Sequence, residues 1–323
     1  MKLNNYNFQK NLNKDFSFEN NPSVAVAVSG GPDSMALLYL ITNWIKIKKG
    51  QITVLIVDHK LRKHSKEEAN SIYEFLTSKK IKTRILNVRK KNVIKKNMNE
   101  ARINRYNLLT NYCRKKNILH LFVGHHLDDN LETFVYRKVS GSDFEGLQSI
   151  KNKSVNNKII IARPLVYYKK DEILKYNKKN SIPFIKDESN HNLKFTRPII
   201  RKFLNETDNS NLSQIKKDFE KIKTYSSIYN SFISQILIKN IKLIKKKYVI
   251  LNLESILILD ELIITKIIIK IYNFFFHKNS FVRSKKVNIL IKEIKSKNFN
   301  KFNLKSMLVQ KHNNSLIFSK KNN

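Results

Sequence analysis

The segment 24–40, VAVAVSGGPDSMALLYL, limits the fold more than any other part of the chain. Its first residues form a short apolar, β-branched run that is typical of a buried strand, and MALLYL continues as an apolar helix. Between the two, adjacent glycines let the backbone turn sharply and direct N–H groups at an anion in front of the helix N-terminus. The segment therefore predicts a strand, a phosphate-binding loop and a helix.

The loop lacks the lysine of the common phosphate loop. The pattern G-x-x-x-x-G-K-[ST] is absent, and an acid, Asp33, lies inside the loop instead. An aspartate beside phosphates is unfavourable unless a cation binds to it, so we predict that Asp33 holds Mg²⁺. The alternative is that Asp33 only caps the helix.

Short apolar runs alternate with helical segments from residue 24 to about residue 165. This alternation predicts a doubly wound, mostly parallel α/β sheet, in which ligands bind at the carboxyl ends of the strands. The lysine- and asparagine-rich runs 89–97 and 151–158 are expected to be exposed loops. The expected strands are 24–28, 52–57, 83–88, 119–124 and 159–162, and the expected helices are 34–48, 65–79, 98–117 and 128–139.

The character of the chain changes after residue 208. Apolar residues from Leu212 to Tyr225 recur at spacings of three and four, which predicts an amphipathic helix, and 305–320 reads as a hairpin that turns at Asn313 and Asn314. We expect an N-terminal extension (1–23), an α/β domain that contains the loop (24–208) and a smaller, mainly helical domain (209–323).

Charge and cysteine content narrow the function. Lys and Arg number 63 against 25 Asp and Glu, a net charge of +38, which favours a polyanionic partner such as nucleic acid. The alternative is a lysine-rich composition without a specific partner, because Asn and Ile are abundant as well. A single cysteine, Cys113, provides no disulfide framework and no cysteine-ligated metal site. No signal peptide or membrane span is expected, which predicts a cytoplasmic protein.

A second cluster of chemically active residues lies in GHHLDDNLET, 124–133. Asp128 and Glu132 are four residues apart and share a helix face, whereas Asp129 points elsewhere, toward the mouth of the expected site. The alternative is an acidic first turn stabilised by the helix dipole. Arg102 and Arg105 share a face of an earlier helix and are candidates for phosphate contacts, or are ordinary solvated residues.

These motifs resemble a known family. SGGPDS is similar to the loop of the N-type ATP pyrophosphatases, or PP-loop superfamily, which cleave ATP between the α- and β-phosphates. Within that superfamily the chain most resembles the tRNA(Ile)-lysidine synthetase family. The resemblance rests on motifs in the same order, namely VDHKLR (57–62), NEARINRY (99–106), GHHLDDNLET (124–133), SGSDFEGL (140–147), RPL (163–165) and DESN (187–190).

The resemblance implies that ATP and Mg²⁺ are used to adenylate O2 of the wobble cytidine of tRNA(Ile) with anticodon CAU. Free L-lysine then attacks C2, and AMP leaves. The resemblance further implies that residues 24–208 form the catalytic domain and that residues 209–323 contact tRNA. The residues implied are Asp33, His126 and Asp129 for catalysis, Asp33 for metal, Ser29, Gly30, Gly31, Pro32, Asp33, Ser34, Asp58, His59, Gly124 and His125 for the nucleotide, and Arg102, Arg105, Asp128, Glu132, Arg163 and Arg201 for lysine or tRNA.

The sequence departs from the family at two places. Asn130 replaces the usual Gln, and Pro198 replaces the usual Asn, while the C-terminal third matches no family motif. Two alternatives stay open: a PP-loop tRNA thiolase, which generally needs cysteines that this chain lacks, and a non-catalytic ATP- or RNA-binding module. The oligomeric state stays open as well.

Overall fold

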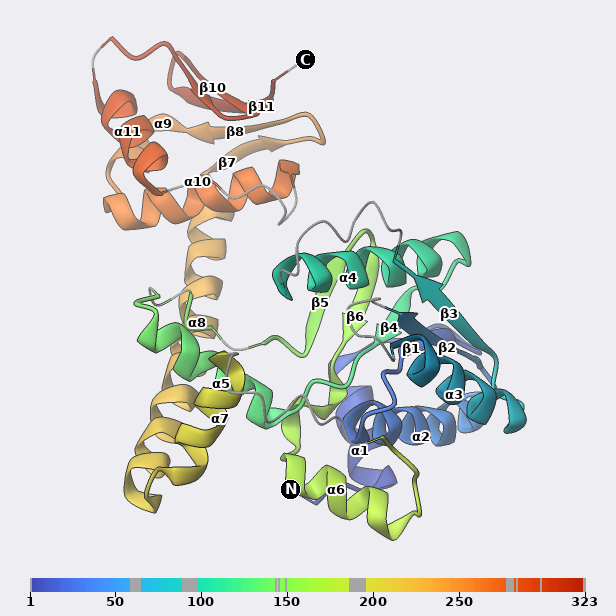
Figure 1. Ribbon diagram of the computed structural model, residues 1–323. Coiled ribbons are helices and arrows are strands. Elements are labelled where there is room, and N and C mark those ends of the chain that lie inside the picture. Colours follow the sequence, from blue (N-terminus) through green and yellow to red (C-terminus); the bar gives the residue numbers. More distant parts are fainter. Residues whose placement is uncertain are drawn as a thin grey trace. The chain divides into compact units, whose positions relative to one another are not determined.

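In the computed structural model, the strand predicted in 24–40 is a central strand of a six-stranded sheet, and the predicted loop and helix follow it (Figure 1). The structure describes residues 2–58, 65–88, 98–142, 144, 146–148, 150–185, 196–276, 282, 284–296 and 298–321. The chain divides into two compact units, Met1–Glu220 and Lys221–Asn323.

The sheet of the first unit has the order β3-β2-β1-β4-β6-β5. All neighbours are parallel except β5 and β6, so the predicted doubly wound, mostly parallel α/β fold is confirmed. The strands are β1 (Ser23–Ala27), β2 (Gln51–Asp58), β3 (Thr83–Asn87), β4 (His120–Phe122), β5 (Lys153–Asn156) and β6 (Ile159–Ala162).

The expectation that 151–158 is a loop is wrong, and the run 89–97 lies outside the described residues. Residues Lys153–Asn156 form β5, which pairs antiparallel with β6 at the edge of the sheet. Asn157 and Lys158 join the two strands with φ of 49° and 67°, the backbone of a two-residue hairpin turn. An edge strand accepts exposed polar side chains, which is why its composition resembled that of a loop.

Helices cover both faces of the sheet. Helix α4 packs on one face, α2 and α3 pack on the other, and α1 packs against α2 (Figure 1). The helices and the 3₁₀ turn of this unit are α1 (Asn5–Asp15), α2 (Pro32–Ile47), α3 (Ser65–Ser78), α4 (Met98–Lys115), α5 (Leu127–Val139), η2 (Pro164–Tyr167), α6 (Lys170–Lys179), α7 (Thr196–Glu206) and α8 (Asn209–Asn240), which continues into the second unit.

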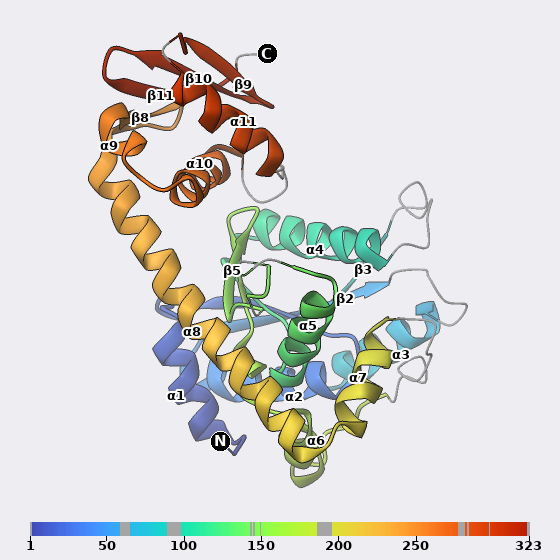
Figure 2. The ribbon, with the colours of Figure 1, turned by 90° about the vertical axis from the view of Figure 1, so that its left-hand side faces the viewer.

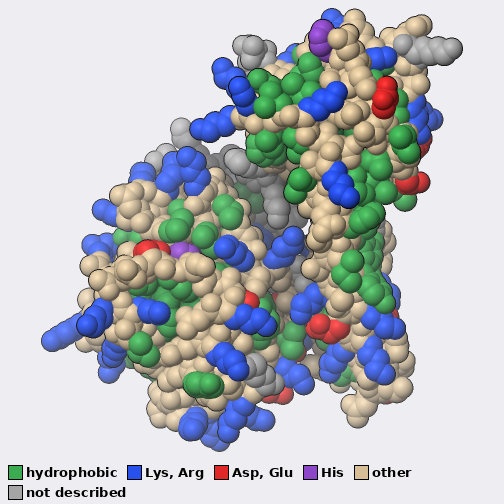
Figure 3. Space-filling model, turned by 180° about the vertical axis from the view of Figure 1, so that it is seen from behind, with side chains coloured by type: hydrophobic (Ala, Val, Ile, Leu, Met, Phe, Trp, Pro, Cys, Tyr) green, Lys and Arg blue, Asp and Glu red, His purple; other side chains and the backbone are tan. Residues whose placement is uncertain are grey.

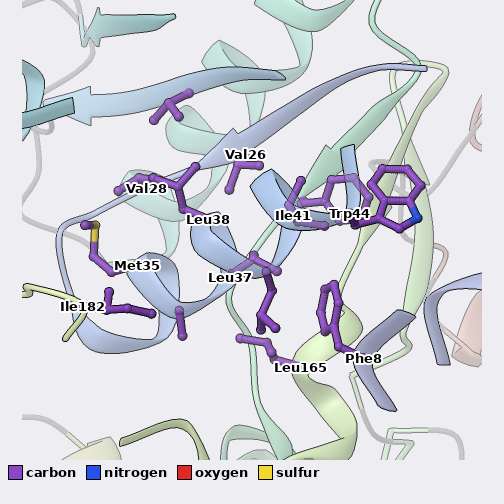
Figure 4. Packing of buried hydrophobic residues seen from close by; sticks show 14 of the residues in the cluster. Phe8, Val26, Val28, Met35, Leu37, Leu38, Ile41, Trp44, Leu165 and Ile182 are labelled. Carbon is purple, nitrogen blue, oxygen red and sulfur yellow. The ribbon is translucent and has the colours of Figure 1, made fainter. Parts of the chain in front are cut away.

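The core around α2 includes the N-terminal segment. Phe8 of α1 is fully buried and lies beside Leu165, on the side of α2 away from Val26 of β1 (Figure 4). Trp44, predicted to be a core residue, is only 1% exposed. Residues 1–23, expected as an extension, thus supply part of the core that fixes α2 and its loop.

Helices α5, α7 and the first half of α8 lie side by side (Figure 2). The ring centroids of Phe134 on α5 and Phe219 on α8 are 5.6 Å apart, and Lys138 Nζ lies 3.2 Å from Asp218 Oδ2. These contacts attach the start of α8 to the first unit.

The second unit combines helices with a five-stranded antiparallel sheet of order β7-β8-β11-β10-β9. The hairpin predicted at Asn313 and Asn314 is confirmed, because His312 pairs with Ser315. The other three strands were not predicted. The elements are β7 (Ile241–Ile244), β8 (Tyr248–Asn252), α9 (Leu253–Leu257), α10 (Glu261–Phe276), α11 (Ser284–Lys295), β9 (Lys301–Leu304), β10 (Met307–His312) and β11 (Ser315–Lys320).

Two surface properties bear on function. Over the described parts of both units, no helix combines the length and the apolar character that a membrane span needs. Lysine and arginine side chains are spread over the face shown in Figure 3 and outnumber the acidic ones there.

Candidate nucleotide-binding site

The loop between β1 and α2 has the geometry of an anion-binding turn. Gly30 has a φ of +80°, a conformation that other residues rarely adopt, and a Cβ there would lie 2.5 Å from Ile72 Cδ1. Gly31 is the N-cap of α2 and provides no capping side chain. Ser34 Oγ donates to the Gly31 carbonyl (2.9 Å) and accepts from the Ser29 N–H (3.2 Å), which closes the loop on itself. The loop therefore presents the N-terminus of α2 to an anion.

Asp33 is the second residue of α2 and not its N-cap, so the capping alternative does not describe its position. Its two carboxylate oxygens accept hydrogen bonds from Lys170 Nζ at 2.6 and 2.7 Å. His126 Nε2 lies 4.0 Å from Asp33 Oδ2. Asp33 is therefore already paired with one positive charge, the ammonium group of Lys170 on α6.

Gly124 joins the two sequence motifs. It follows β4, and a Cβ at this position would lie 3.2 Å from both Asp33 C and Ser34 N. Such distances are shorter than those of most Cβ contacts, so a side chain here would push the two backbone segments slightly apart. The absence of a side chain is therefore what lets the GHHLDD segment approach the first turn of α2.

His126 lies among three carboxylates. It is the N-cap of α5, is 5% exposed, and has Asp128 Oδ2 3.5 Å from Nδ1 and Asp129 Oδ2 3.6 Å from Nε2. Burial opposes its protonation, but the contact with Asp128 and the charges of Asp129 and Asp33 outweigh burial and raise the pKa of His126. The cluster therefore favours the positively charged form of His126, in which both ring nitrogens are protonated.

Asp128 and Asp129 also hold backbone groups in place. Asp129 Oδ2 accepts from the His126 N–H at 3.0 Å, and Asp128 Oδ2 accepts from the Lys170 N–H at 2.6 Å. Burial alone would raise the pKa of Asp128, but the nearby His126 imidazole and the hydrogen bond from the Lys170 N–H lower it. Asp128 therefore stays ionised and ties α5 to the start of α6.

His125 differs from its neighbour. Its Nδ1 is buried without a hydrogen-bond partner. Burial, opposed by Asp129 and assisted by the positive charge of Arg163 and of Arg102, lowers the pKa of His125 to about 3. The side chain is a neutral imidazole at physiological pH.

Arginines converge beside His125. The Cζ atoms of Arg102 and Arg105, both on α4, lie 5.3 and 5.5 Å from the centroid of the Tyr106 ring. Arg163 is 7% exposed and donates from Nη1 to Lys151 O and Ser154 Oγ. Burial lowers the pKa of Arg163, and the charge of Arg102 adds to the effect. A concentration of positive charge of this kind favours an anionic ligand.

Arg137 belongs to the same group but was missed from the sequence. Its Nη1 donates to the Gly146 carbonyl at 2.9 Å, and it also bonds the Gln148 carbonyl. Burial and the charge of Arg102 lower its pKa. The one signal in the sequence was its place on the helix that carries the acidic cluster.

Other predicted site residues contact each other or lie elsewhere. Glu132, 3% exposed, accepts two hydrogen bonds from Arg201, at 2.7 Å from Nε and 3.2 Å from Nη2. Asp58 is buried at the end of β2 and accepts from Ser65 Oγ at 2.9 Å. His59 and the motif 187–190 lie outside the described residues.

The two departures from the family pattern have simple structural settings. Asn130 is buried, and its Oδ1 accepts from the Ile150 N–H at 2.9 Å. Pro198 lies in the first turn of α7, where a proline is compatible with a helix.

The described residues include no group of three or more His, Cys, Asp or Glu side chains arranged to hold a metal ion. Mg²⁺ in phosphate sites needs only one or two carboxylates, because phosphate oxygens and water complete its shell. Asp33, at the mouth of the anion-binding turn, fits that requirement.

Comparison with known proteins defines the class. The PP-loop domain family matches residues 4–207, and the chain belongs to that family. Two tRNA(Ile)-lysidine synthases are similar to it: that of Orientia tsutsugamushi is 41% identical over 198 residues, and that of Wolbachia pipientis is 42% identical over 207 residues. The matches cover 61% and 64% of this chain but 45% and 48% of the relatives, so the chain spans about half the length of the relatives that it matches.

A solved structure shares the fold. The U34-tRNA thiolase NcsA of Methanococcus maripaludis, solved with its [4Fe-4S] cluster, superposes with a TM-score of 0.55 at 18% identity, covering 68% of this chain and 79% of that chain. In this chain the single cysteine, Cys113, is fully buried, and burial raises its pKa to about 12.

Proposed function

We propose that the chain forms lysidine: it uses ATP to join L-lysine to C2 of the wobble cytidine of tRNA(Ile) with anticodon CAU, releasing AMP and pyrophosphate. The observation that carries this proposal is the junction at Gly124, which brings Asp33 of the anion-binding loop together with His126 and Asp129. The similarity to the two tRNA(Ile)-lysidine synthases supports the same reaction.

The loop from Ser29 to Ser34 would hold the phosphates of ATP through its backbone N–H groups. Asp33 would hold Mg²⁺, which neutralises charge on the phosphates when it is bound. Asp58, Gly124 and neutral His125 lie at or just beyond the carboxyl ends of their strands, the edge of a parallel sheet where nucleotides bind. His59 belongs to the same proposal by resemblance alone.

Adenylation solves a chemical difficulty. The O2 oxygen of cytosine is a poor leaving group, and it leaves readily once it is attached to AMP. The amine of lysine must then lose a proton as it attacks C2. We assign this step to Asp129, whose carboxylate would accept the proton, and the positively charged imidazole of His126, 3.6 Å away at Nε2, would keep that carboxylate ionised until then.

The arginine group would bind the anionic partner. Arg102, Arg105, Arg163 and Arg137 carry positive charge beside the nucleotide site, and we assign them to tRNA phosphates. Asp128, Glu132 and Arg201 would support the lysine side of the site by fixing α5, α6 and α7. Residues 209–323 remain our candidate for further tRNA contacts.

The test is incubation of the protein with ATP, transcribed tRNA(Ile) and labelled amino acids. We expect lysine label in the tRNA and a mass increase of one lysine less one water on the wobble cytidine. A tRNA in which that cytidine is replaced by uridine is the control and should not react. Release of ADP and phosphate, preference for another amino acid, or entry of sulfur would reject the proposal.

A further inference from the structure

The phosphate-binding loop has no positive charge of its own. Residues 24–40 contain no lysine or arginine, whereas in the G-x-x-x-x-G-K-[ST] loop a lysine of the loop itself meets the phosphates. In the structure an ammonium group reaches the loop from another element. Lys170 Nζ lies 2.6 and 2.7 Å from the two carboxylate oxygens of Asp33, across a separation of 137 residues.

The backbone of Lys170 is held where it can serve the loop. Its N–H donates to Asp128 Oδ2 at 2.6 Å, so the residue is bound through both main chain and side chain. On the same helix, fully buried Asn177 donates from Nδ2 to the Pro32 carbonyl at 2.9 Å. Helix α6 is therefore fixed against the first turn of α2 at two points.

The pair is open to a ligand. The side chain of Lys170 is 34% exposed and that of Asp33 is 25% exposed. An ammonium group has three hydrogen-bond donors, so Lys170 can bond Asp33 and a phosphate oxygen together. A metal ion bound to Asp33 would also compensate the negative charge that Lys170 compensates in the empty loop. The ammonium can therefore turn toward a phosphate without any movement of α6.

We propose that Lys170 binds the β- and γ-phosphates of the nucleotide and so supplies, from α6, the lysine that the loop lacks. The proposal rests on the proposed function only in that a nucleotide occupies this loop. It is independent of which group the enzyme transfers.

The test measures nucleotide binding without turnover. Titration calorimetry with Mg²⁺ compares α,β-methylene-ATP, which cannot be cleaved between those phosphates, with AMP, which lacks the β- and γ-phosphates. Lys170→Met should weaken binding of the analogue by about tenfold to hundredfold, the range of one charge-assisted hydrogen bond, and leave AMP binding unchanged. Lys170→Arg should retain most of the affinity. The matched control is Lys178→Met, which removes an exposed lysine at the other end of α6.

The outcomes are distinct. Analogue binding by Lys170→Met that equals or exceeds that of the wild type would mean that Lys170 only neutralises Asp33 in the empty loop, and the inference would be wrong. If Lys170→Met does not fold, Lys170→Gln, which keeps a donor for Asp33 but no charge, answers the same question. A wild-type protein that does not bind the analogue would reject the proposed function itself.

Discussion

The bond between Glu132 and Arg201 is expected to stabilise the first unit strongly. The side chain of Glu132 is 4% exposed and that of Arg201 is 40% exposed, and two hydrogen bonds join them. Arg201→Met leaves a carboxylate buried between α5 and α7 without these bonds. Breaking a fully buried pair costs about 3–5 kcal/mol. Because water can reach this one from the arginine side, we expect a loss of about 2–3 kcal/mol.

The single tryptophan provides the assay. Trp44 is buried in the first unit, so its fluorescence during urea denaturation reports the unfolding of that unit. For Arg201→Met the midpoint should fall by about 1 M urea with an unchanged slope. In the double variant with Glu132→Gln the losses should not add, because the second change removes the uncompensated charge.

Lys202→Met is the control. Lys202 pairs with Glu206 on the same helix, but both side chains are more than half exposed, so the loss should stay below about 0.5 kcal/mol. Equal midpoints for Arg201→Met and Lys202→Met would refute the argument that burial makes the Glu132 pair important.

Further predictions concern the loop junction, a buried histidine and the cysteine. Gly124→Ala should lower the free energy of unfolding by about 1–3 kcal/mol and abolish nucleotide binding, because the added Cβ would meet the backbone of α2. Gly141→Ala, with no atom within 4 Å of the added Cβ, should cost only about 1 kcal/mol for its φ of +66°. Nucleotide binding by Gly124→Ala equal to that of the wild type would contradict this prediction. The pKa of His125 is lowered in the folded protein, so below about pH 6.5 this residue binds a proton in the unfolded state but not in the folded state. The free energy of unfolding should therefore decrease as the pH falls, by about 2 kcal/mol at pH 5. His125→Gln should remove that part of the acid loss in urea titrations at pH 7.5 and pH 5, and an identical pH profile would count against it. Cys113 should react with a thiol reagent only after denaturation, since it is fully buried and its pKa is raised to about 12; rapid reaction of the native protein would disprove this.

Local sequence patterns determined most of the first unit. The five parallel strands were predicted because each lies in a short, mostly apolar run between helical segments, and the loop before α2 was predicted because two glycines separate a strand from a helix. The hairpin at Asn313 and Asn314 followed from its turn residues in the same way. These features depend on neighbours in the chain, so one sequence is enough to find them.

Elements whose role depends on distant contacts were missed. Residues 5–15 have no apolar run, yet Phe8 and Leu12 are fully buried because the core around α2 offers them a place. Strand β5 is polar because it lies at the edge of its sheet. Strands β7 and β8 of the second sheet were not predicted, since they follow directly after the long helix α8.

The candidate site shows the same division. The sequence alone was enough to propose Asp33, His126 and Asp129 as candidates for the chemistry, and it shows that a glycine precedes the paired histidines. Only the tertiary structure decided that Gly124 brings the two motifs into contact and that Lys170, 137 residues from Asp33, provides the ammonium beside the loop. An ion pair between such distant residues leaves no periodicity in the sequence, because it depends on where the fold places helix α6 and not on the residues beside it.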